Sequence, residues 1–376
     1  MKERIVELDM VKGIFIVSVM LLHTMSCTGV DQLCPEFAKY YGSFILFSMA
    51  GFYLLSGYTY SQGKLNVKDT ILKKAKSILL PYYYYAIPML AVLFLVYVLL
   101  EKRTMGWFAD GLLAVMLQIQ SVHIYGDGVG IHEMMYSVFA SWFIFQLMAA
   151  FVVFIPIYHS IEKRSLYVKL TAAVLLLGMG ALFYHLDIQQ LNGKFIPPVC
   201  KGLILPNIWG VAGLLMLGKC ISILGLLNVD RQSAGQKAAL FIASLIILSI
   251  GLATDDHLYD FPIGKWGGFN ELSYFITPVC GLALTLLCVY IANLLKRSDI
   301  IKKISLFLGK NSLDFLLVHF FWIWLILYIG GFWYPILSGV ELPAAAVDKY
   351  LLHFAGAFPL VLALNSIVIV AKEKLR

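Results

Sequence analysis

The sequence predicts an all-α membrane protein, a polytopic helical bundle of about ten transmembrane helices formed by a single domain over residues 1–376. Three observations predict this fold. Of the 376 residues, 60% are hydrophobic and 14% are charged, with a mean hydropathy of +0.83. Ten apolar stretches are long enough to cross a bilayer, and the basic residues gather in alternate connecting segments. This composition is more apolar than the core of a soluble domain requires.

Each predicted span follows from its length, because about 20 apolar residues cross the hydrocarbon core. The spans are expected at residues 8–28, 37–60, 78–100, 134–158, 168–185, 202–225, 238–254, 273–295, 311–330 and 347–371. No small-residue cleavage site follows the first span, so we expect it to be retained. The long segment 101–133 contains an apolar stretch, 107–120, that could form a re-entrant or interfacial helix. We expect no appended soluble domain.

The distribution of basic residues orients the bundle. With the N-terminus in the cytoplasm, twenty of the 29 Lys and Arg residues lie in inner segments, seven in outer segments and two within spans. The positive-inside rule therefore predicts cytoplasmic N- and C-termini. Because this placement accounts for the net charge of +7, we expect membrane lipids as partners and no nucleic acid.

The first span carries ionisable residues at helical spacing. Lys12 and His23 are eleven residues apart, which brings them within roughly 20° of one helical face and about 16 Å apart along it. Asp9 can pair with Lys12 at i,i+3. Ionisable groups inside a span are costly and are therefore candidates for function. The structural alternatives are a Lys12 side chain that extends to the interface, a solvated Asp9 and a His23 that bonds a neighbouring helix.

Cysteine and histidine patterns give no sign of a metal site. The six cysteines form no CxxC pair, and His123 with His132 and Glu133 does not match a zinc-helix spacing. We expect no metal. Cys27 and Cys34 could both lie near the outer surface, where a disulfide is one alternative to two free thiols.

Four stretches together resemble the membrane-bound acyltransferase 3 family. The first runs from Leu8 to His23, with a basic residue, ten intervening residues and a histidine. The others are the aromatic stretch 47–58, followed by a basic segment 73–76 and Pro-aromatic 81–83; Ser141-Trp142-Phe143; and the Gly-Lys-Asn-Ser-Leu…His stretch 308–319. The Lys12-Gly13 pair most resembles a branch of intercellular-adhesin and enterobacterial-antigen type acetyltransferases. Two departures are Lys12, where the family most often has Arg, and the acidic Asp314.

The resemblance implies an acyl-CoA-dependent O-acetyltransferase of the bacterial cytoplasmic (inner) membrane. Its acceptor would be an extracytoplasmic cell-envelope glycan, free or lipid-linked, and acetyl-CoA its donor. The resemblance makes His23 the catalytic residue. The candidates for the donor site are Lys12, Asp9, Lys73, Lys74 and Lys76. The candidates for substrate binding are Trp142, Asn311 and His319, with an interfacial anchor or a structural hydrogen bond as the alternatives for these three.

A second class of function also fits intramembrane charges. A transporter or flippase for a glycan or small metabolite would use them as a proton relay or substrate site. Such proteins often consist of two similar halves, and the sequence contains no such repeat. A sensor or scaffold would leave the spacing of Lys12 and His23 unexplained. Acyl transfer is therefore the favoured hypothesis.

Overall fold

The computed structural model describes residues 5–33, 35–61, 63, 65–106, 108–109, 112, 142–185, 205–253, 273–330 and 347–374. The elements are α1 (Val6–Thr28), α2 (Val30–Leu33), α3 (Pro35–Tyr58), α4 (Val67–Leu93) with the π-helix η1 (Phe94–Leu100), α7 (Trp142–Ile161), α8 (Leu166–His185), α10 (Leu205–Leu224), the 3₁₀ turn η3 (Val229–Arg231), α11 (Ala234–Ala253), α12 (Ser273–Leu295), α13 (Asp299–Lys310), α14 (Ser312–Ile329) and α15 (Val347–Lys374).

The all-α prediction is confirmed, since these residues contain helices and no strand. A helix occupies each of the ten predicted ranges. Nine of the described helices are long and apolar enough to cross a membrane, and the tenth predicted span is α3, with 24 residues. The chain is therefore a multi-pass membrane protein. The predicted stretch 107–120 and the polar outer segments around His132 and Asp255 lie outside the described residues.

Two helical segments differ from the prediction. The basic residues 68–76, expected in a loop, form the first turns of α4, because Asn66 caps the helix by accepting a hydrogen bond from the Asp69 amide at 2.8 Å. A separate helix, α13, precedes the ninth span, and Ser298 is its N-cap. The exposed isoleucines Ile300 and Ile304 give α13 an unpartnered apolar side, as expected for a helix at the membrane interface.

The contacts between helix ends agree with the predicted alternation of spans. The ten-span arrangement places Glu7, Asp230 and Lys296 on one side of the membrane, and Lys296 forms ion pairs with both acids. It places Glu101 and Tyr328 on the opposite side, and the Tyr328 hydroxyl donates to Glu101 at 2.7 Å. Segments far apart in sequence therefore meet at the depths that the alternation requires.

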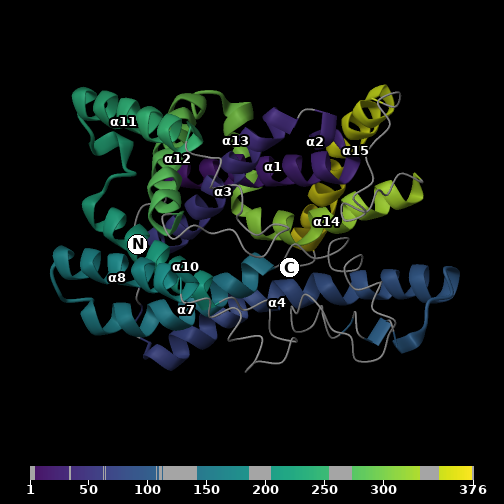
Figure 1. Ribbon diagram of the computed structural model, residues 1–376, viewed down its shortest axis with the longest axis horizontal. Coiled ribbons are helices and arrows are strands. Elements are labelled where there is room, and N and C mark those ends of the chain that lie inside the picture. The colour runs from purple at the N-terminus through teal and green to yellow at the C-terminus, as the bar shows by residue number, and fades with distance from the viewer. Residues whose placement is uncertain are drawn as a thin grey trace.

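Helices α1 and α3 are central in the bundle. Figure 1 shows α4, α7, α8 and α10 along one half of the molecule and α1, α13, α14 and α15 along the other. Helix α3 contacts α1, α10 and α12, and α1 contacts α2, α3, α12, α13, α14 and α15. The first span is thus enclosed by helices rather than by lipid on most of its circumference.

Small residues allow the closest helix crossings. A Cβ on Gly57 of α3 would lie 2.0 Å from the Leu215 carbonyl oxygen of α10, and a Cβ on Gly218 would lie 2.0 Å from the Leu54 oxygen. The two backbones therefore touch, which maximises dispersion contact where no hydrophobic effect drives helix association. Ser56 donates to the Phe52 carbonyl of its own helix, a structural role.

Candidate functional site

The first and ninth spans bring two histidines together. His23 of α1 and His319 of α14 are 296 residues apart in sequence, and the distance from His23 Nδ1 to His319 Nε2 is 2.8 Å. The ring planes differ by 10° and the ring centroids are 5.1 Å apart. The rings therefore meet edge to edge and nearly coplanar, which is the geometry of a hydrogen bond directed along an imidazole lone pair.

Backbone carbonyls determine which nitrogens carry protons. His319 Nδ1 lies 2.8 Å from the Leu316 oxygen and 3.0 Å from the Phe315 oxygen, and a carbonyl only accepts. Nδ1 of His319 therefore carries the proton, and in the neutral ring Nε2 is left as an acceptor. His23 must then donate from Nδ1, so its own Nε2 bears the free lone pair. A chain of hydrogen bonds that starts at the α14 backbone thus fixes the tautomer of His23.

The neutral state of both rings follows from their surroundings. His319 is fully buried, and the ion pairs among the described residues join carboxylates to lysine or arginine, not to either histidine. An imidazolium without a counter-charge is costly at membrane depth. The Phe320 ring, whose centroid is 4.4 Å from that of His23, adds an apolar wall. His23 is only half-buried, so it is the member of the pair that a substrate can reach.

The other ionisable residues of the first span lie as predicted. Because α1 runs unbroken from Val6 to Thr28, Lys12 and His23 share one helical face, about 16 Å apart. The predicted i,i+3 ion pair forms, with Lys12 Nζ 3.6 Å from Asp9 Oδ1. Helix α13 crosses α1 at this level, where a Cβ on Gly309 would lie 1.6 Å from the Asp9 oxygen. Backbone packing therefore holds the start of α1 in place.

The basic residues of α4 form a cluster with Lys12. Lys12 and Lys73 both lie close enough to Lys74 for their charges to act on it. Lys74 Nζ sits 4.9 Å from the centre of the Phe151 ring and 5.8 Å from that of Tyr60, so cation–π contacts hold it partly inside the bundle. Among the described residues, the ion pair with Asp9 offsets the charge of Lys12, and the two further positive charges of Lys73 and Lys74 make the start of α1 attractive to an anion.

The remaining candidates are more scattered. Lys76 is exposed on α4, and Trp142 is the first residue of α7. Their predicted roles stay predictions. Cys27 is a free, buried thiol, and Cys34 lies outside the described residues.

Asn311 and Asp314 connect the C-terminal helix to the bundle. The Asn311 amide donates to the Phe307 carbonyl at 3.1 Å and to Glu373 Oε1 at 3.4 Å. Asp314 Oδ1 accepts from Lys372 Nζ at 2.5 Å, which explains an acid where the resemblance led us to expect an uncharged residue. Both side chains thus anchor α15, and the substrate role of Asn311 stays a prediction.

The sequence alone does not pair His23 with His319. Both were candidates, but only helix packing reveals that their rings touch. The available signal was that each is a histidine within a different apolar span, in the second half of α1 for His23 and just before the middle of α14 for His319.

Comparison with known proteins agrees with this architecture. A family model described as an acyltransferase domain matches residues 5–370, nearly the whole chain. Searches of curated proteins and of solved structures found no match. Because the match covers nearly the whole chain, from the first span into the last, and includes both histidines, the chain belongs to the acyltransferase 3 family and is a membrane acyltransferase.

Proposed function

We propose that this protein transfers an acyl group, in the simplest case acetyl, from cytoplasmic acyl-CoA to a hydroxyl of an extracytoplasmic cell-envelope glycan, with His23 as the catalytic residue. The observation that carries the proposal is the His23–His319 pair. It presents an unprotonated Nε2 in an apolar, partly accessible position, which suits a general base or a nucleophile.

The lysine cluster supports the proposal that the acyl donor carries phosphate groups. Lys12, Lys73 and Lys74 concentrate positive charge about 16 Å along α1 from His23, on the side where the positive-inside rule places the cytoplasm. The nucleotide phosphates of CoA would bind there, and the pantetheine arm would extend along α1 to bring the thioester to His23.

His23 could transfer the acyl group by either of two routes, direct or covalent. In direct transfer, Nε2 takes the proton of the acceptor hydroxyl, the oxygen bonds to the thioester carbon, the C–S bond breaks and the proton passes to the departing thiolate. In the covalent route, Nε2 bonds to the acyl carbon, the C–S bond breaks, and CoA leaves as the thiolate, which takes up the acceptor's hydroxyl proton in the second step. The acceptor hydroxyl then takes the acyl group from the imidazole.

Calorimetric titration of acetyl-CoA into the detergent-purified protein tests the donor assignment. We expect saturable binding that is weakened about tenfold or more by Lys12→Ala, since a hydrogen bond to a charged group contributes roughly 1.5–3 kcal/mol. Lys163→Ala, an exposed lysine between α7 and α8, is the matched control and should bind as the wild type does. Absence of binding to a folded wild-type protein, or equal effects of the two variants, would contradict the donor site.

A further inference from the structure

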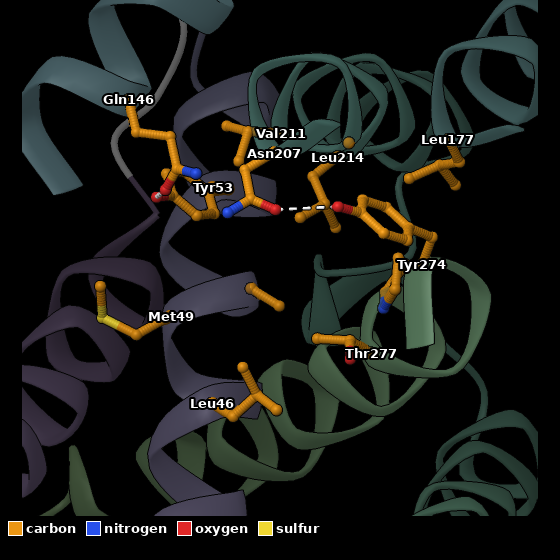
Figure 2. A pocket seen from close by; sticks show the side chains of 13 residues that line it. Leu46, Met49, Tyr53, Gln146, Leu177, Asn207, Val211, Leu214, Tyr274 and Thr277 are labelled. Atoms are coloured by element: carbon orange, nitrogen blue, oxygen red, sulfur yellow. Dashed lines mark hydrogen bonds between the residues drawn. The ribbon is translucent and has the colours of Figure 1, made fainter. Parts of the chain in front are cut away.

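A small cavity lies between α3, α7, α8, α10 and α12, away from the histidine pair. The space in it that water molecules can occupy is about 40 Å³. One water molecule needs roughly 10–15 Å³ of such space, so the cavity has room for about two or three. Its walls are mostly apolar, with Leu46, Met49 and Leu214 among them (Figure 2). A few polar side chains also line it, and they determine what it can hold.

Two tyrosines orient two amide groups that line this cavity. The Tyr53 hydroxyl donates to Gln146 Oε1 at 2.7 Å, and the Tyr274 hydroxyl donates to Asn207 Oδ1 at 2.9 Å. Because each amide oxygen is engaged, the NH₂ group on the other side of the amide remains as a donor. Figure 2 shows the two amide groups pointing toward one another between α7 and α10. Both residues are more than nine-tenths buried, so these donors cannot reach bulk water.

Thr277 provides a third polar group, and its hydroxyl departs from a pattern seen in other buried hydroxyls. The Thr24, Ser48 and Thr285 hydroxyls each donate to the carbonyl four residues earlier in their own helix, at 2.7–2.8 Å. Thr277 Oγ1 forms no hydrogen bond with the residues that the structure describes, although Thr277 is only 6% exposed. Buried polar groups are nearly always satisfied, so this hydroxyl indicates a partner inside the cavity that Thr277 lines.

The size and the chemistry of the cavity together select water. A cavity lined only by apolar groups stays dry, whereas two NH₂ donors and a hydroxyl supply the partners that buried water requires. Among the described residues no charged side chain lines the cavity, so an ion would be buried without a counter-charge. We propose that the cavity binds a cluster of about two or three ordered water molecules, which bridge the Gln146 and Asn207 amides to the Thr277 hydroxyl.

The water cluster joins two groups of helices. Helix α10 packs on α3, α7 and α8, whereas α12 packs on α1, α3 and α11. Gln146 and Asn207 belong to the first group and Thr277 to the second, and Figure 1 shows the two groups in different halves of the molecule. A water-mediated hydrogen bond is nearly as favourable as a direct one. The cluster therefore adds to the bond between Tyr274 and Asn207 as a polar connection between these groups.

X-ray footprinting of the protein in lipid nanodiscs tests for water in the cavity directly. Radiolysis of a bound water molecule produces a hydroxyl radical that oxidises the nearest side chain, and mass spectrometry locates the oxidised residue. Met49 lines the cavity, and Met89 of α4 is the matched control because each is 5% exposed. We expect Met49 to be oxidised several-fold faster than Met89. Equal rates would overturn the proposal.

Thr277→Val tests the hydroxyl through the sign of its effect on stability. If water bonds this hydroxyl, valine leaves the water without a partner, and the unfolding temperature should fall about 2 °C or more below that of the control variant. A hydroxyl that is unsatisfied in the folded protein would give the opposite sign, since valine would remove a buried polar group of similar shape. Thr285→Val is the matched control, because Thr285 lies in the same helix, is fully buried and bonds within α12.

The two measurements meet in the Thr277→Val variant, where oxidation of Met49 should slow toward the rate of Met89. A higher unfolding temperature, an effect equal to that of Thr285→Val, or an unchanged rate for Met49 would each overturn the proposal. If Thr277→Val does not fold, the comparison of Met49 with Met89 in the wild type still decides. Neither measurement involves acyl-CoA, so the outcome is independent of the function proposed above.

Discussion

Replacing His319 should impair catalysis by His23, although the substituted side chain does not itself contact the substrate. His319→Leu removes the acceptor 2.8 Å from His23 Nδ1, in a contact between the buried His319 and the half-buried His23. A buried donor left without a partner costs about 1–3 kcal/mol, and the His23 proton is then free to move to Nε2, which is the nitrogen required to be unprotonated. One to three kcal/mol corresponds to roughly 5- to 150-fold in rate, so we expect kcat/KM to fall about 10- to 100-fold.

His319→Gln is the conservative counterpart. Its amide oxygen can take the place of Nε2 as the acceptor for His23, so activity should stay within about fivefold of the wild type. Nitrogen-15 NMR of histidine-labelled protein supplies a readout independent of activity, with the His23 signals assigned by their loss in His23→Gln. The wild type and His319→Gln should show a protonated Nδ1 on His23, and His319→Leu should show a mixture.

Either of two results would refute this reasoning. The first is a folded His319→Leu variant with wild-type activity and an unchanged His23 tautomer. The second is a wild-type protein in which His23 carries its proton on Nε2. If Leu and Gln lowered activity equally while the tautomer stayed fixed, His319 would serve only to pack the helices.

Three further predictions concern the framework that holds the site. Gly309→Ala places a Cβ 1.6 Å from a carbonyl oxygen of α1 and should cost at least about 1–3 kcal/mol of stability, whereas Gly178→Ala, which meets open space, should be neutral in thermal unfolding. The Glu7 carboxylate raises the pKa of Lys296, so this ion pair stabilises the fold below the unfolded lysine pKa and is lost as the pH rises through the raised value. The unfolding temperature of the wild type should therefore fall more steeply above about pH 10 than that of Glu7→Gln. Lys372→Leu leaves an acid of α14 unpaired, and limited proteolysis should then release the C-terminal helix more rapidly than in the wild type.

Much of the fold follows from local sequence because each span must satisfy its own backbone hydrogen bonds in lipid. The apolar length of the chain and the alternation of basic residues are sufficient to locate the ten helices. Helix α13 was missed because its apolar residues are interrupted by Lys302 and Lys303, so no long apolar run marks it.

The site could be predicted only in part. The spacing of Lys12 and His23 is a property of one helix and needs no tertiary information. The contact between His23 and His319, and that between Lys12 and Lys74, join different helices and depend on how those helices cross. Neither periodicity nor spacing specifies a crossing angle or a register between spans, so these pairs emerge only from the packed structure.

The most direct test of the central claim is transfer of radiolabelled acetyl from acetyl-CoA to envelope material in membranes that contain equal amounts of wild-type or His23→Ala protein. The account predicts saturable incorporation by the wild type and a loss of at least about a hundredfold in the variant, since general-base catalysis contributes 10²–10⁴-fold. Undiminished incorporation by His23→Ala would contradict it.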